Sequence, residues 1–154
     1  MLLTNYSESI EEFSYFWDSF FIRMNHQFTL PKKEHLCGEI RISKLFTEGK
    51  AFIVYPIRVV YRIDEKSDGE PVKMMVSVPK KRFKRAVKRN RLKRLMREAY
   101  RLNKAQLLDI IQLKTLNLQI AFNYVSNDEA DYGLIESKMI AALKRITDNI
   151  ESKV

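Results

Sequence analysis

The stretch KKRFKRAVKRNRLKRLMREAYR, from Lys80 to Arg101, decides the fold because it is strongly basic and also regularly apolar. Between Lys80 and Lys104 the chain has thirteen Lys or Arg residues and one acid, Glu98, whereas the remainder has a net charge of −3. A concentrated patch of this kind attracts polyanions through its local field. Nucleic acid and anionic membranes are therefore the candidate partners.

Apolar residues follow one helix face along this stretch. They are Leu92, Leu95, Met96, Ala99, Tyr100 and Leu102, and the opposite arc has Asn90, Arg91, Lys93, Arg94, Arg97 and Arg101. This pattern predicts an ordered amphipathic helix on a core, with a first turn that stands clear of the sheet so that bases project on several sides. Because Leu108 and Ile111 fall on the basic side, we expect the helix to break near Asn103 and Lys104.

The charge pattern discriminates among partners. A solvated helix face normally mixes signs, because like charges at neighbouring positions destabilise a helix, and here most of that repulsion is uncompensated. A membrane-surface helix needs a free apolar face, and here the core uses that face. Nucleic acid is therefore favoured, and arginine suits phosphate because its planar fork donates to two oxygens at once.

The flanking segments predict a small α/β fold. A short helix is expected at 39–48, before Gly49, after an extended lead-in at 28–38. Strands are expected at 50–63 with an interruption at Pro56, at 72–78 and at 117–125, with a turn at 64–71 and a closing amphipathic helix at 131–150. This order corresponds to an α/β (α+β) two-layer sandwich, in which helices pack on a small mixed sheet.

A single domain is predicted over residues 28–150, with an N-terminal extension at 1–27 and a tail at 151–154. The extension has the only tryptophan and four of the nine phenylalanines, and it matches no motif. We expect it to be disordered, helical or the product of a start site upstream of Met24. Its acids do not fit a secretory signal, and no apolar run approaches the length of a membrane span.

No catalytic or metal-binding residue is predicted. His26 and His35 lack a partner for nucleophilic chemistry, and with the single Cys37 they cannot complete a zinc site. The sequence DEAD at 128–131 lacks the glycine-rich phosphate loop of a helicase, so its acids are predicted to cap the next helix. A lone cysteine fits a reducing compartment, and we expect a cytoplasmic location.

The stretch SVPKKRFKRAVKRNRLKRLMREAYR, residues 77–101, closely resembles the signature of the bacterial ribonuclease P protein family. That family has a serine–lysine strand end and a helix with an Arg-Asn-Arg triplet, here residues 89–91. The segment LFTEGKAF at 45–52 resembles the end of the family's first helix and its exit. The resemblance extends from about residue 28 to the last helix.

The resemblance implies a left-handed strand–helix–strand crossover through the basic helix, opposite to the usual hand. It also implies that the chain acts as the protein component of ribonuclease P and assists removal of the 5′ leader of precursor transfer RNA. The catalytic RNA would perform the hydrolysis with magnesium ions, and the protein alone would bind no cofactor. The implied partners are the catalytic RNA and precursor transfer RNA, without DNA or membrane.

The resemblance also implies site residues. RNA contacts are expected from Lys80, Lys81, Arg85, Arg89, Asn90, Arg91, Lys93, Arg94 and Arg97. Asn90 either hydrogen-bonds RNA or caps local backbone. Ile42, Phe46 and Tyr61 are candidates for a cleft that holds the leader, although Ile42 and Phe46 equally suit a core, and the family usually has an aromatic residue at position 42.

Two rival functions share some of these features. A general RNA-binding or ribosome-associated module would have the same basic helix without a role in transfer RNA processing. A DNA-binding protein would present a recognition helix within a compact helical motif, which the strand-rich core disfavours.

Overall fold

The computed structural model describes residues 29–65 and 69–152. The extension predicted at 1–27 lies outside the described residues, as does the end of the tail. The domain boundaries proposed from the sequence therefore stay a prediction.

The described residues form a mixed sheet, as predicted, and it has four strands. Its strands are β1 (Lys50–Val54), β2 (Ile57–Asp64), β3 (Val72–Ser77) and β4 (Asn117–Tyr124), in the order β1-β2-β4-β3. β2 pairs antiparallel with both β1 and β4, whereas β3 and β4 are parallel neighbours. A parallel pair requires a long crossover, and the basic helix lies within it.

The segment predicted as one strand interrupted at Pro56 is a hairpin of two strands. Val54 pairs with Ile57 across a tight turn that contains the cis Tyr55–Pro56 peptide. A proline cannot donate to a strand ladder, so its position marks the place where the chain reverses.

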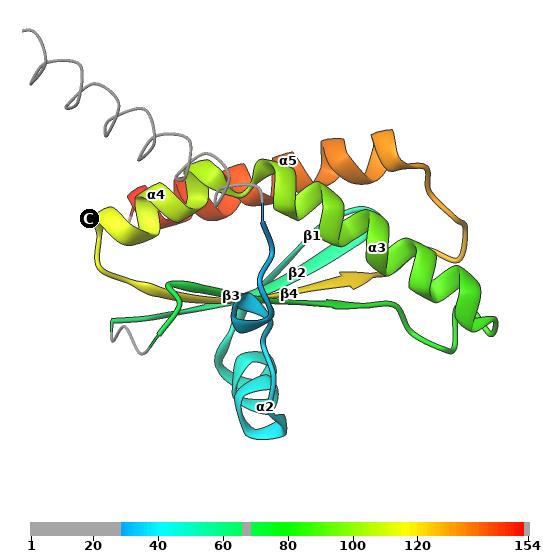
Figure 1. The fold of residues 1–154 in the computed structure, drawn as a ribbon, viewed down its shortest axis with the longest axis horizontal. Helices are drawn as coiled ribbons and strands as arrows, with labels where there is room; N and C mark the ends of the chain where they lie inside the picture. The colour runs from blue at the N-terminus through cyan, green and yellow to red at the C-terminus, as the bar shows by residue number, and fades with distance from the viewer. Residues whose placement is uncertain (1–28, 66–68, 153–154) are drawn as a thin grey trace, which may run out of the picture.

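The helices lie on both sides of the sheet (Figure 1). They are the 3₁₀ turn η1 (Lys32–Glu34), α2 (Glu39–Glu48), α3 (Ala86–Asn103), α4 (Ala105–Leu113) and α5 (Tyr132–Glu151). In Figure 1, α3, α4 and α5 cover one face and the short α2 lies on the other. The predicted break after Asn103 is confirmed, but α4, which follows it, was not predicted as a separate helix.

The main core lies between the sheet and α3 with α5. The predicted stripe of α3 is largely confirmed, because Leu92, Met96, Ala99 and Tyr100 are at most 1% exposed. Leu102 is 37% exposed, so its assignment to the core is wrong. It lies in the last turn of α3, next to the break. The predicted stripe of α5 is confirmed, with every member buried: Ile135, Met139, Leu143, Ile146 and Ile150.

A buried ion pair ties the lead-in to the helical layer. Lys104, between α3 and α4, is fully buried and its Nζ lies 2.6 Å from Glu34 Oε2. The same ammonium group donates to the backbone carbonyl of Thr29. The lead-in predicted as extended therefore includes the η1 turn, which supplies the carboxylate for this contact.

Candidate nucleic-acid interface

The first six residues of α3, Ala86 to Arg91, stand clear of the core. None of them is buried, and the Val87 side chain is 79% exposed, whereas Leu92 is the first buried residue of the helix. The prediction that the first turn projects from the sheet is therefore confirmed, and its bases are accessible from several directions.

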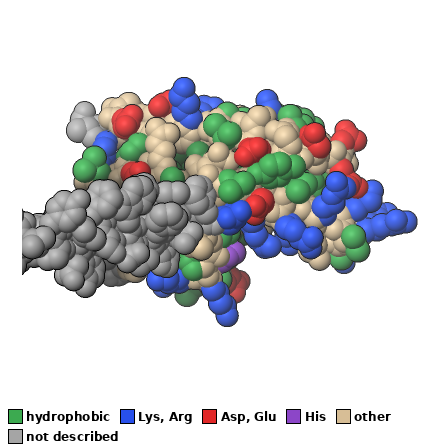
Figure 2. Space-filling view, turned by 45° about the horizontal axis from the view of Figure 1, so that its top comes forward, with side chains coloured by type: hydrophobic (Ala, Val, Ile, Leu, Met, Phe, Trp, Pro, Cys, Tyr) green, Lys and Arg blue, Asp and Glu red, His purple; other side chains and the backbone are tan. Residues whose placement is uncertain are grey.

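The nine predicted RNA-binding residues gather around this projecting end. Figure 2 shows Lys and Arg side chains crowded at the end of the molecule where α3 begins in Figure 1. Most of the set is exposed: Lys80, Lys81, Arg85, Asn90, Arg91, Arg94 and Arg97. Lys93 and Arg89 are half-buried. Among the described residues, Lys93, Arg94 and Arg97 have no hydrogen-bond or ion-pair partner, so their charges are free to meet a ligand.

Arg89 differs from its neighbours because it holds the loop before the helix. Its Nη1 donates to the carbonyl oxygens of Phe83 at 2.8 Å and Lys84 at 2.7 Å. Phe83 is buried and its ring lies 5.8 Å from that of Tyr124. Arg89 thus fixes the loop that carries the nearby lysines, a role that sequence reasoning missed because no local pattern reveals a bond to a preceding carbonyl.

The loop between β4 and α5 meets the start of α3 through polar contacts. Glu129 Oε1 lies 2.6 Å from Lys88 Nζ, and its Oε2 lies 3.3 Å from Arg91 Nη1. Arg82 donates to Asn127 Oδ1 at 2.9 Å in the same region. The hydrogen bond from Lys88 lowers the pKa of the Glu129 carboxyl, although burial opposes this, so the carboxyl is ionised at neutral pH.

The DEAD segment therefore has two roles. Asp131 accepts a hydrogen bond from the backbone nitrogen of Leu134 at 3.1 Å and caps α5, which confirms the predicted capping role for that residue. Glu129 does not cap the helix and instead faces the bases of α3. Sequence reasoning assigned all of these acids to the helix end and missed the contact across 38 residues.

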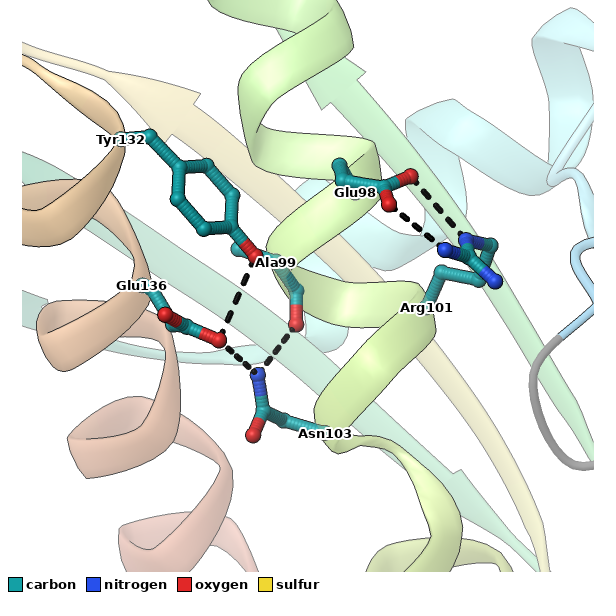
Figure 3. Close-up of polar contacts among 6 residues, drawn as sticks. All are labelled: Glu98, Ala99, Arg101, Asn103, Tyr132 and Glu136. Atoms are coloured by element: carbon teal, nitrogen blue, oxygen red, sulfur yellow. Dashed lines mark hydrogen bonds and ion pairs between the residues drawn. The ribbon is translucent and has the colours of Figure 1, made fainter.

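Near the end of α3, the side chains of Glu98, Arg101 and Asn103 are paired. Arg101 forms an ion pair with Glu98 at 2.6 Å, which lowers the pKa of that carboxyl. Asn103 donates to the carbonyl oxygen of Ala99 and to Glu136 on α5 (Figure 3). This end of the helix is therefore a structural junction and the opposite end is the accessible basic surface.

The three candidates for a leader cleft do not share one surface. Ile42 and Phe46 lie one turn apart on α2, where Ile42 packs against a small core cluster and Phe46 is 43% exposed. Tyr61 is 3% exposed and belongs to the core on the other face of the sheet. Its hydroxyl accepts a hydrogen bond from Asn149 of α5. The grouping of Tyr61 with Ile42 and Phe46 is therefore wrong.

The sheet face that carries α2 is only partly covered. A hollow of about 330 Å³ lies at this face, with Arg41 and Lys44 of α2 on one side. Lys73 of β3 and Gln119 of β4 line its floor, where the Gln119 Oε1 is buried without a hydrogen-bond partner among the described residues. Asp64, Glu65 and Glu70 line it as well, so the hollow is a polar surface with charges of both signs.

Neither a metal-ligand cluster nor a membrane span occurs in the part of the chain that the structure describes. No group of three or more His, Cys, Asp or Glu side chains in residues 29–65 and 69–152 is arranged so that it could hold a metal ion. In the same residues, no helix is both long enough and apolar enough to cross a bilayer.

Comparison with known sequences gives a consistent result. The family model described as Ribonuclease P matches residues 30–147. The ribonuclease P protein component of Porphyromonas gingivalis is 50% identical over 125 residues, which covers 81% of this chain and 91% of that protein. The corresponding protein of Chlorobium phaeobacteroides is 39% identical over 108 residues, covering 65% of this chain and 74% of that protein.

Comparison with solved structures concerns the fold alone. The RNase P protein of Staphylococcus aureus superposes with a TM-score of 0.61 at 18% identity, covering 75% of this chain and 96% of that one. The RNase P protein from Thermotoga maritima gives a TM-score of 0.56 at 24% identity, covering 72% and 96% respectively. The arrangement of helices on a four-stranded mixed sheet is shared with both.

Proposed function

The chain belongs to the ribonuclease P protein family, and from this premise we propose how its surfaces take part in the reaction. The protein is the protein component of ribonuclease P, a ribonucleoprotein endoribonuclease, and a role in transfer RNA processing follows. An RNA subunit is its implied partner. The assignment of particular residues to that partner and to the substrate is our proposal.

We propose that the projecting end of α3 and the loop before it bind phosphates of the catalytic RNA. The observation that carries this proposal is the absence of core packing around Ala86 to Arg91, which leaves a basic helix end exposed on several sides. Lys80 and Lys81 extend the same surface, and Arg94 and Arg97 continue it along the helix. Such contacts release counterions from RNA and bring a second RNA chain within reach at lower electrostatic cost.

Asn90 supports the same proposal. Its exposed side chain has no hydrogen-bond partner among the described residues, so capping of local backbone is not its role in this structure. Arg85 is the residue before the helix and is also exposed. We assign both to RNA contacts beside the phosphate-binding bases.

We propose that the 5′ leader of precursor transfer RNA lies along α2 and the uncovered face of the sheet. Phe46 offers an exposed ring on which a base can stack, and Ile42 supplies an apolar contact one turn away. Arg41 and Lys44 border the adjoining hollow and can follow the phosphates of a single strand. Tyr61 has no place in this proposal, because it faces the opposite core.

Magnesium belongs, in this proposal, with the RNA of the holoenzyme. The described residues form no set of metal ligands, so their contribution is to position RNA and substrate. The ions would supply activation of water and stabilisation of the leaving oxygen when bound. We place the reaction in the cytoplasm, since the free and exposed Cys37 suits a reducing compartment.

Reconstitution tests the proposed function. The protein is mixed with the ribonuclease P RNA of Porphyromonas gingivalis and a labelled precursor transfer RNA, and the cleavage products are mapped. We expect cleavage at the mature 5′ end at low magnesium only when both protein and RNA are present. Robust cleavage by the protein without RNA would contradict the proposal. If the protein bound the RNA but did not change cleavage, the alternative of a general RNA-binding module would be favoured.

A further inference from the structure

Glu129 is placed where a ligand of the basic surface would be expected. Its two carboxylate oxygens face two bases of α3, Lys88 at 2.6 Å and Arg91 at 3.3 Å. The two bases lie almost one helical turn apart, so a single anion can bridge them. A carboxylate and a phosphate present similar oxygen atoms to such a pair, and both accept charge-assisted hydrogen bonds.

We propose that Glu129 is an internal counter-anion of the RNA-binding surface, which an RNA phosphate displaces when it binds Lys88 and Arg91. This inference rests on the proposed RNA-binding role of α3. In the free protein Glu129 neutralises part of the surface and holds the two side chains in place. In the complex, phosphate oxygens take its position and the carboxylate turns towards solvent.

The balance of the two effects gives the direction of the expected change. An ion pair between partly exposed side chains contributes little to the free energy of unfolding. Loss of the ion pairs that Glu129 makes with Lys88 and Arg91 should therefore lower stability only slightly. A carboxylate beside an incoming phosphate repels it, and the local negative charge opposes binding. Removal of the charge should therefore strengthen RNA binding, and the folded state should be nearly unaffected.

The contacts of the loop support displacement without unfolding. Asp131 remains fixed by its cap of α5, and the Tyr124 hydroxyl holds Asp128 and Ala130 through backbone contacts. Glu129 lies between these anchored positions, so its side chain can rotate while the loop keeps its path. Phosphate binding thus needs only a change of side-chain conformation at this position.

The test compares Glu129→Gln with Glu98→Gln in the full chain. Glu98 is the matched control because it is also paired with an arginine, Arg101, on the same helix, but at the structural end of α3. Affinity for the ribonuclease P RNA of Porphyromonas gingivalis is measured over a range of KCl concentrations. We expect Glu129→Gln to bind about three- to tenfold more tightly than the parent, and Glu98→Gln to change affinity by less than about twofold.

A double-variant cycle isolates the contact. Glu129→Gln is introduced into a protein that already has Lys88→Met and Arg91→Met. In that protein, the gain in RNA affinity caused by Glu129→Gln should shrink to the small change caused by Glu98→Gln. Unchanged or weaker binding of Glu129→Gln in the parent protein overturns the inference. An equal gain from Glu98→Gln, or a gain that persists without the two bases, also overturns it, because net charge alone would then explain the effect.

A second probe separates this inference from the proposed function. The same variants are titrated with inorganic polyphosphate, which presents phosphates without an RNA fold. If the parent binds polyphosphate but not the catalytic RNA, the proposed function fails, and the gain of Glu129→Gln on polyphosphate still decides the role of Glu129. Where the parent binds the RNA, the RNA titration decides the inference; where it does not, absence of the gain on polyphosphate ends it.

Discussion

The first six residues of α3 and the twelve that follow contain three and four bases respectively, yet the two parts are held in place by different forces. The first part, Ala86–Arg91, has no buried residue and is fixed by polar contacts to two loops. The second part, from Leu92 to Asn103, packs its apolar stripe on the sheet and α5. The bases of the first part thus depend on polar contacts for their placement, whereas Arg94 and Arg97 of the second part are carried by a helix that the core holds.

This difference separates folding from binding within one helix. Burial of Leu92, Met96 and Tyr100 supplies hydrophobic free energy that does not depend on the charges of the opposite arc. The projecting end can therefore keep like charges close together, because the helix is nucleated and held elsewhere. Substitutions on the buried face and on the exposed basic arc should therefore act on different measurements.

The largest expected effect concerns the buried ion pair at the end of the second part. Lys104→Met removes the ammonium group and leaves Glu34 buried without its partner, which should lower the free energy of unfolding by about 3–5 kcal/mol. Denaturant unfolding measures the loss. The double variant Lys104→Met with Glu34→Leu should recover most of it, since no buried charge remains unpaired. Equal stability of the single variant and the parent would contradict this account.

The second largest effect is expected from a substitution that creates a cavity in the core. Met96→Ala removes a fully buried side chain from the second part of α3 and should cost about 2–5 kcal/mol of unfolding free energy. Val87→Ala, in the exposed first part, is the control and should change stability by less than about 0.5 kcal/mol. Similar losses for both variants would show that the projecting end also belongs to the core.

The sequence predicts the second part of α3 well because a helical stripe repeats over several turns. Leu92, Met96, Ala99 and Tyr100 share a face at regular spacing, and so the side chains that meet the core follow from geometry alone. Leu102 continues the spacing but lies in the last turn and is exposed, and periodicity does not reveal which positions the neighbouring elements cover.

Strand β2 shows why Tyr61 was misplaced. Ile57, Val59, Val60 and Tyr61 are all buried, so the strand lacks the alternation that would assign each residue to a face. The direction of the Tyr61 side chain depends on the register with β4, in which Tyr61 lies opposite Ile120, a residue distant in the sequence. Contacts between distant segments likewise hid the pairing of Glu129 with Lys88.

The exposed arc of α3 provides the third prediction. Arg91→Ala, Arg94→Ala and Arg97→Ala made together should leave the melting temperature unchanged or slightly higher, because repulsion between like charges falls. If each arginine contacts one RNA phosphate, the slope of log affinity against log salt should become shallower by about 2–3 units. An unchanged slope would mean that this arc is only solvated, and an unfolded variant would mean that the arginines are structural.

The smallest expected effect tests Arg89, which lies in the projecting part but makes contacts of a structural kind. Arg89→Lys keeps the positive charge but replaces the guanidinium that reaches the carbonyl oxygens of Phe83 and Lys84. Loss of one such hydrogen bond should lower the free energy of unfolding by about 1 kcal/mol. Because the charge is kept, the salt slope of RNA binding should stay within about 0.5 units of the parent, less than the change for one lost phosphate contact. Arg94→Lys is the control, since Arg94 has no partner among the described residues and should show no loss of stability. An Arg89→Lys protein as stable as the parent would contradict the structural role of Arg89, because the two hydrogen bonds to the loop carbonyl oxygens would then contribute nothing to the folded state.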